Sequence, residues 1–117
     1  MNILVCEDNI MTLKLIEQSL KKAGYHVFNA EDGFQAIKIL GKEKIDLVIT
    51  DINVPYTKGL ELIRYINTQM DTEIPVIVVT GITNEETRVH AMELGARAYL
   101  TKPFDPRVML DLVKSFS

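Results

Sequence analysis

The sequence contains a single cysteine, Cys6, and no tryptophan. One cysteine cannot close a disulfide within the chain, which excludes a disulfide-stapled secreted scaffold and agrees with a reducing cytosol. No apolar run approaches the roughly 20 residues that a membrane-spanning helix needs. The N-terminus also lacks a basic segment followed by an apolar stretch and a cleavage site, so no secretory leader is predicted. We therefore expect a cytoplasmic protein that makes no membrane contact.

Internal repeats, low-complexity tracts and Gly/Ser/Pro-rich linkers are absent too, and so is any excess of basic charge. The net charge is −3, from 13 basic and 16 acidic residues, which argues against direct binding of nucleic acid. The 117 residues, of which 47% are hydrophobic and 25% are charged, are enough for one hydrophobic core but not for two. We predict one globular domain over residues 1–117.

Five short apolar segments alternate with segments of helical spacing. The apolar segments are Asn2–Cys6, Tyr25–Asn29, Asp46–Thr50, Pro75–Thr80 and Arg97–Thr101. The first, third and fourth contain continuous runs of Ile, Leu and Val, which are typical of parallel strands covered on both faces. The second is shorter and more polar, so it suits an edge strand.

Local signals indicate where the intervening helices begin and end. Gly24 and Gly41 are predicted to terminate the first two helices. Thr83–Glu86 has the spacing of a capping box at the start of the fourth helix, which then runs to Gly95. Asp105-Pro106 suits an N-cap followed by proline at the first helical position.

Alternating strands and helices predict a parallel sheet with right-handed crossovers and helices on both faces. The fold class expected is α/β: a (βα)5 flavodoxin-like three-layer sandwich whose five-stranded sheet has the order 2-1-3-4-5. In such sheets ligands bind beyond the carboxyl ends of the strands, beside the switch between strands 1 and 3.

Polar residues stand where the predicted strands end: Glu7 and Asp8, Asp51, Thr80, and Lys102. Strands 1 and 3 are neighbours in the predicted order, so three carboxylates would share one crevice and repel one another unless a cation joins them. Magnesium binds through one or two carboxylates together with waters and phosphate oxygens. The acidic residues therefore predict a magnesium site.

The same edge of the sheet suits phosphoryl chemistry. An aspartate can act as nucleophile and form an acyl phosphate, and phosphoryl transfer depends mainly on alignment and on positive charge around the phosphoryl oxygens. The metal would supply one such contact, the Lys102 ammonium a second and the Thr80 hydroxyl a third. We expect Asp51, Thr80 and Lys102 to perform the chemistry.

These residues resemble the receiver domain of bacterial two-component response regulators, in its chemotaxis-regulator-like form, over the whole chain. The shared motifs are Glu7-Asp8, Asp51 with Pro55 and Gly59, Thr80-Gly81, and Lys102-Pro103-Phe104. The resemblance implies that Asp51 accepts a phosphoryl group from a histidine kinase or a histidine phosphotransfer protein. It further implies that the protein is a signalling phosphoacceptor rather than a conventional enzyme, although it assists its own phosphorylation and dephosphorylation.

Further roles follow from the resemblance alone. Glu7, Asp8, Asp51 and the backbone carbonyl of Asn53 would bind Mg²⁺. Tyr99 would be the aromatic switch residue that responds when Thr80 moves toward the phosphate. The output surface would be the face built from the fourth helix, the fifth strand and the fifth helix, with an unknown downstream partner. The Lys102–Pro103 peptide bond would be cis.

Other functions fit the sequence less well. A haloacid-dehalogenase-type hydrolase would have Asp-x-Asp after its first strand, where this chain has Glu7-Asp8-Asn9. A flavodoxin-like flavin carrier would have a Ser/Thr/Gly-rich phosphate loop there, and the acidic loop would repel the phosphate. A degenerate receiver used only for binding would not need the complete set of acids, threonine and lysine.

Overall fold

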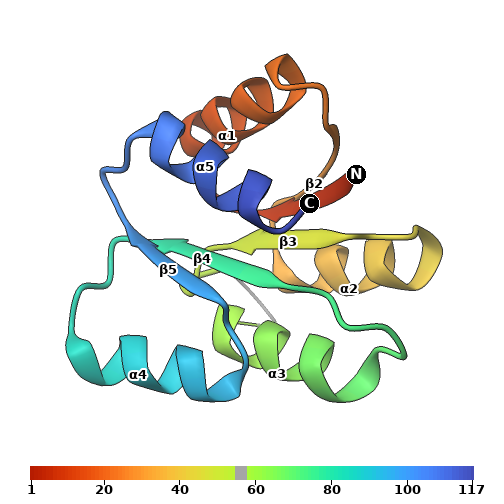
Figure 1. The fold of residues 1–117 in the computed structure, drawn as a ribbon. Helices are drawn as coiled ribbons and strands as arrows, with labels where there is room; N and C mark the ends of the chain where they lie inside the picture. The colour runs from red at the N-terminus through yellow and green to blue at the C-terminus, as the bar shows by residue number, and fades with distance from the viewer. Residues whose placement is uncertain (55–57) are drawn as a thin grey trace.

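Parallel strands form the centre of the structure, a computed structural model that describes residues 1–54 and 58–117. The strands are β1 (Asn2–Cys6), β2 (His26–Ala30), β3 (Leu47–Thr50), β4 (Val76–Thr80) and β5 (Ala98–Thr101). The helices are α1 (Ile10–Lys22), α2 (Gly33–Lys42), α3 (Gly59–Gln69), α4 (Glu85–Leu94) and α5 (Pro106–Ser115). Strands and helices alternate along the chain, as the sequence predicts (Figure 1).

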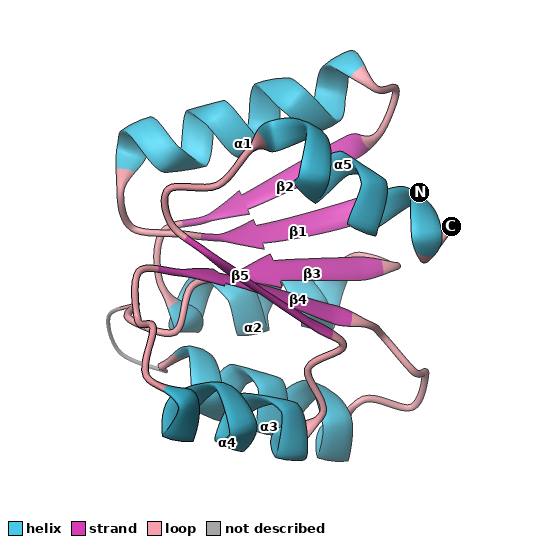
Figure 2. Cartoon of the chain, turned by 60° about the vertical axis from the view of Figure 1, so that its left-hand side comes forward, coloured by secondary structure: helices cyan, strands magenta, loops and turns pink. Residues whose placement is uncertain are grey.

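The sheet has the strand order β2-β1-β3-β4-β5, and every neighbouring pair is parallel. The predicted flavodoxin-like order is therefore confirmed, and β2 is an edge strand as expected. Helices α1 and α5 cover one face of the sheet, and α2, α3 and α4 cover the other (Figure 2). Because all strands run the same way, their carboxyl ends lie at one edge, which in Figure 2 is where the arrows of β1, β2 and β3 point.

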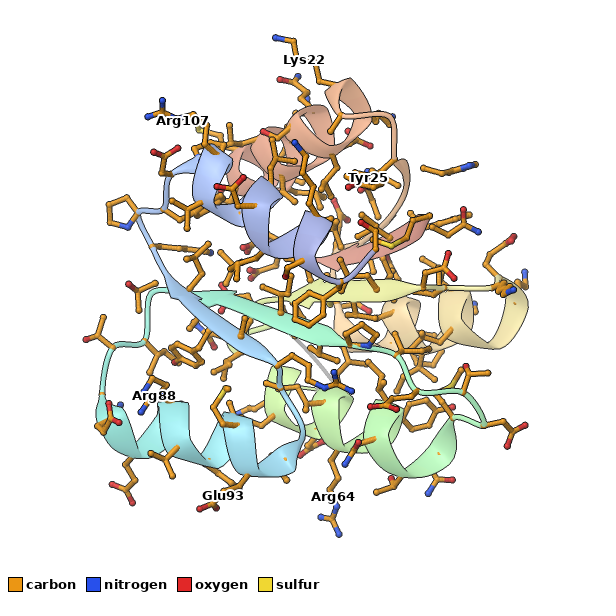
Figure 3. All side chains as sticks on the ribbon, viewed as in Figure 1. Lys22, Tyr25, Arg64, Arg88, Glu93 and Arg107 are labelled. Carbon is orange, nitrogen blue, oxygen red and sulfur yellow. The ribbon has the colours of Figure 1, made fainter. Side chains whose placement is uncertain are left out.

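Two apolar layers enclose the sheet because successive strand residues point to opposite faces. In β1, Ile3 and Val5 pack with α1 and α5, whereas Leu4 and Cys6 pack with the helices of the other face. Strands β1, β3 and β4 are buried almost throughout, which explains their continuous apolar runs. The charged side chains of Arg64 on α3 and Glu93 on α4 project away from the sheet (Figure 3).

Most of the predicted helix ends are confirmed. Gly24 and Gly95 have φ values of 95° and 122°, a region that favours glycine, and Asp105 caps α5 ahead of Pro106. Gly41 was predicted to end α2, but this prediction is wrong, because the helix continues to Lys42.

The capping box proposed for Thr83 is also wrong. The N-cap of α4 is Asn84, whose side-chain oxygen accepts a hydrogen bond from the amide of Thr87 at 2.8 Å. Asparagine is at least as good an N-cap as threonine, so the helix starts one residue later than the pattern indicated. Across residues 1–54 and 58–117, the helices are all too short or too polar to cross a bilayer.

Cys6 is fully buried in β1. Burial raises the pKa of its thiol to about 12 from the ordinary value of 9.0. Because the thiolate is the reactive form, we expect Cys6 in the native protein to react with an aromatic disulfide at pH 8 about 10³-fold more slowly than in urea. Following the released thiolate by absorbance, with and without denaturant, checks this. Equal rates in both conditions would contradict it.

Candidate functional site

The predicted site residues are placed by hydrogen bonds that continue the sheet beyond the strand ends. The amide of Glu7 donates to the carbonyl of Ala30 at 2.9 Å, and the amide of Asp51 donates to the carbonyl of Cys6 at 3.1 Å. The amide of Lys102 likewise donates to the carbonyl of Thr80 at 2.8 Å. Each residue is therefore held in register with a neighbouring strand, and the side chains face one crevice.

Lys102 joins two of the predicted acidic residues. Its Nζ lies 2.6 Å from Oε1 of Glu7 and 2.8 Å from Oδ2 of Asp51. Glu7 is 1% exposed and Asp51 is 6% exposed, so both carboxylates have lost most of their contact with water. Buried charges persist only when they are paired and hydrogen-bonded. The shared ammonium provides this pairing for both acids.

For Glu7 and for Lys102, burial and charged hydrogen-bond partners shift the pKa in opposite directions. Burial raises the pKa of Glu7 above its ordinary value, despite hydrogen bonds from Lys102 and Asn9 that favour the charged form. For Lys102, burial favours the neutral amine, but hydrogen bonds to Asp51 and Glu7 outweigh it and raise the pKa. Lys102 therefore stays positively charged beside Asp51 at neutral pH.

Each carboxylate is also oriented by a backbone amide two residues further along. The amide of Asn53 donates to Oδ1 of Asp51, and the amide of Asn9 donates to Oε2 of Glu7, both at 3.1 Å. Asn9 additionally caps α1 by accepting a hydrogen bond from the amide of Thr12. The start of α1 and the turn after β3 thus fix the directions of the two acids.

Thr80 and Tyr99 are linked through one residue. Thr80 is fully buried at the end of β4, and the hydroxyl of Tyr99 donates to the carbonyl of Ile82 at 2.7 Å. The amide of Ile82 lies 3.4 Å from the hydroxyl oxygen of Thr80, a long hydrogen bond. Tyr99 packs against the apolar layer of α2, α3 and α4, and Phe104 packs against the other layer. The two aromatic residues therefore lie on opposite faces of the sheet.

Asp8 does not contact Lys102, unlike Glu7 and Asp51. It is exposed after β1 and makes no hydrogen bond or ion pair with other described residues. Within residues 1–54 and 58–117 no three His, Cys, Asp or Glu side chains are grouped closely enough to hold a metal ion together. The donors present, two buried carboxylates and backbone carbonyls, are all oxygen atoms, which suits Mg²⁺ because it needs only one or two carboxylates besides water and phosphate.

Gly59, a residue of the predicted motif, and Thr50 both contact the main chain of Asp51, which the sequence pattern did not indicate. A Cβ atom at Gly59 would lie 2.2 Å from the carbonyl oxygen of Asp51. The backbone at the start of α3 is therefore in close contact with the main chain of Asp51. The hydroxyl of Thr50 donates to the same carbonyl oxygen at 2.8 Å. Threonine is common in strands, and nothing in its spacing distinguishes this one. Pro55, part of the same predicted motif, lies outside the described residues.

The peptide bond between Lys102 and Pro103 is cis, as predicted. It directly follows Lys102, whose Nζ contacts both buried acids. Beside this turn, a groove is lined by Thr12 and Leu15 of α1 and by Lys102, Pro103 and Phe104.

Known proteins are similar to this chain in sequence. The family model described as "Response regulator receiver domain" matches residues 3–114. The aerobic respiration control protein ArcA of Escherichia coli strain K12 is 39% identical over 106 residues, which are 91% of this chain and 44% of ArcA. The alkaline phosphatase synthesis transcriptional regulatory protein PhoP of Bacillus subtilis is 35% identical over 113 residues, 97% of this chain and 47% of PhoP. The chain thus spans about half the length of these relatives.

Solved structures show the same fold. A CheY-like response regulator receiver domain protein from Methanospirillum hungatei JF-1 superimposes with a TM-score of 0.90 at 30% identity, covering 97% of this chain and 90% of that one. The chemotaxis response regulator CheY4 of Vibrio cholerae gives a TM-score of 0.91 at 28% identity, with 99% and 98% covered. Together with the family match over residues 3–114, these similarities show that the chain belongs to the response regulator receiver domain family of two-component signalling systems.

Proposed function

We propose that this chain, residues 1–117 as a single receiver domain, accepts a phosphoryl group on Asp51 in a magnesium-dependent reaction. The observation that supports this most directly is the ammonium of Lys102, within 2.8 Å of Asp51 and 2.6 Å of Glu7 at the carboxyl edge of the sheet. A buried carboxylate beside a fixed cation is suited to nucleophilic attack on phosphorus, because the cation also neutralises charge on the phosphoryl oxygens.

Each residue of the site has a separate role in the proposed phosphoryl transfer. A carboxylate oxygen of Asp51 forms the new P–O bond while the P–N bond to the donor histidine breaks. Lys102 and the Thr80 hydroxyl contact phosphoryl oxygens. Glu7, Asp8, Asp51 and the carbonyl of Asn53 would hold Mg²⁺, which when bound supplies positive charge to the phosphoryl oxygens.

We propose a histidine kinase or a histidine phosphotransfer protein as the phosphoryl donor. Apolar side chains support a protein donor, because Ile10, Met11 and Leu15 of α1 are exposed beside the site, Met11 by 83%. Exposed apolar side chains that cluster on a soluble domain commonly mark a contact with another protein. We further propose that the protein acts in the cytoplasm.

The proposed response to phosphorylation is a change of the face formed by α4, β5 and α5. Tyr99 and Thr80 are connected through Ile82, so a displacement of Thr80 toward the phosphate would alter the position of Tyr99. Val89 and Met92 are exposed on α4 next to this region, which gives the face apolar side chains for a partner protein. We propose no direct contact with nucleic acid or a membrane.

The test of the proposed function is incubation with acetyl phosphate, with magnesium or with a chelator, followed by intact-mass analysis. We expect a gain of one phosphoryl group that requires magnesium and that hydroxylamine removes, because it cleaves acyl phosphates. A gain that persists in chelator would contradict the metal dependence.

A negative result in both conditions calls for beryllofluoride titration followed by NMR. No spectral change there would exclude phosphoacceptor function and would leave a receiver used only as a binding module. Release of inorganic phosphate from small phosphate esters, with no phosphoprotein accumulating, would instead favour the hydrolase alternative.

A further inference from the structure

The main-chain carbonyl of Asp51 is confined as closely as its carboxylate. The Thr50 hydroxyl donates to it at 2.8 Å. The backbone of Gly59 approaches so closely that a Cβ atom would lie 2.2 Å from the oxygen. Movement away from Thr50 would break the hydrogen bond, and there is no room for a side chain between the carbonyl and Gly59.

The next peptide group is held in the same way. The carbonyl of Ile52 accepts a hydrogen bond from the amide of Gly59 at 2.9 Å. The two peptide groups between Asp51 and Asn53 are thus each anchored through their carbonyl oxygens. Their orientation determines where the Asn53 amide meets Oδ1 of Asp51, at 3.1 Å, and where the Asn53 carbonyl lies.

A hydroxyl group at position 50 needs an explanation, because Thr50 has no exposed surface. Its neighbours across the sheet are Cys6 and Val78, and valine would fill the same volume. Burying a hydroxyl is unfavourable unless it forms a hydrogen bond. Here the hydroxyl donates to the Asp51 carbonyl at 2.8 Å, and the thiol of Cys6 is a second polar neighbour.

We propose that Thr50 is a positioning residue for the phosphoacceptor. Its hydroxyl fixes the Asp51–Ile52 peptide, and through it the spacing between the Asp51 carboxylate and the Asn53 carbonyl that would both bind Mg²⁺. This inference rests on the proposed function. It adds a hydrogen bond to the backbone of Asp51, from a residue that is not among the proposed metal ligands or phosphoryl contacts.

The experiment compares the parent protein with Thr50→Val, which removes the hydroxyl at constant volume, and Thr50→Ser, which keeps it. Ile77→Val in β4 is the matched control, since it removes a buried methyl group from the other apolar layer. The measurements are the carbonyl ¹³C shift of Asp51 in metal-free protein, Mg²⁺ affinity by NMR titration, and the rate of phosphoryl uptake from acetyl phosphate. Loss of an indirect contact of this kind typically lowers affinity or rate about tenfold or more.

We expect Thr50→Val to shift the Asp51 carbonyl resonance upfield and to weaken both Mg²⁺ binding and phosphoryl uptake about tenfold. Thr50→Ser should restore all three, and Ile77→Val should leave them unchanged while lowering thermal stability. Parent-like values for Thr50→Val, or equal losses in Thr50→Ser, would overturn the proposal.

Proton exchange at the Thr50 hydroxyl tests the hydrogen bond without any substitution. In the parent protein the Thr50 hydroxyl proton should exchange slowly enough with water to be seen by NMR, and a rapidly exchanging proton would contradict the hydrogen bond even if Thr50→Val did not fold. If the parent protein takes up no phosphoryl group, the proposed function fails. The carbonyl shift and the Mg²⁺ affinity still decide whether Thr50 positions Asp51.

Discussion

Asp51→Asn is expected to lower phosphoryl uptake from acetyl phosphate by more than about 10³-fold, because an amide oxygen cannot replace the carboxylate nucleophile. The side chains have nearly the same shape, and Lys102 retains its partner Glu7 at 2.6 Å. The variant should therefore fold. Removing one of two buried acids that share one ammonium also relieves repulsion on Glu7, whose pKa burial and the charge of Asp51 both raise.

Intact-mass analysis after incubation with acetyl phosphate and magnesium measures this effect. Asp71→Asn is the matched control, since it makes the same chemical change at an exposed residue between α3 and β4, and it should be phosphorylated like the parent. If the Asp51→Asn variant gains a phosphoryl group at the parent rate, the acceptor lies elsewhere. Peptide mapping of the reduced acyl phosphate would then identify it, with Asp8 as the first residue to inspect.

Gly59→Ala is expected to destabilise the fold by about 3 kcal/mol. The new Cβ would stand 2.2 Å from the Asp51 carbonyl oxygen and 2.5 Å from the Cα atom of Ile52. Both are backbone atoms in a buried turn, so neither can rotate away as a side chain would. The start of α3 or the turn after β3 has to move, and such a movement also displaces Asp51, so slower phosphoryl uptake is expected as well.

Chemical denaturation monitored by circular dichroism gives the free energy of unfolding for this comparison. Gly41→Ala is the internal control, because the residue is helical and a Cβ built there meets nothing within 4 Å beyond its chain neighbours and the backbone of its own helix. That variant should gain about 0.5–1 kcal/mol, as alanine is favoured over glycine within helices. Similar free energies of unfolding for Gly59→Ala and the parent would contradict this prediction, because they would show that α3 can move away from Asp51 without loss of stability.

Much of the architecture could be predicted from local pattern. Continuous apolar runs identified the central strands of the sheet. The more polar segment Tyr25–Asn29 corresponds to the edge strand β2, which begins and ends one residue later, at His26 and Ala30. The errors occurred where two local signals compete. Gly41 resembles a helix terminator, but the helix extends past it to Lys42, and Asn84 rather than the neighbouring Thr83 caps α4.

The site was predictable to a similar extent. Glu7, Asp51 and Lys102 were expected together because the ends of parallel strands meet at one edge, and the structure places them within hydrogen-bond distance. Grouping Asp8 with them was an expectation from the same pattern, and its exposed position leaves its role as a metal ligand a proposal. The link from Tyr99 to the Ile82 carbonyl, and from the Ile82 amide to Thr80, depends on side-chain directions that residue spacing does not specify.

The order of residue types along the chain was sufficient to predict the alternating fold and the acids, threonine and lysine at the strand ends. These features follow from local propensity and apolar periodicity, which are encoded in short segments. The strand order was predicted from the known order of flavodoxin-like sheets with right-handed crossovers. Only the tertiary structure shows that Lys102 pairs with both buried acids. It also shows that the backbone of Gly59 lies close to the Asp51 carbonyl and that the Thr50 hydroxyl donates to the same carbonyl. Such contacts depend on how the start of α3 and the ends of separate strands pack together. Local sequence patterns do not specify this packing.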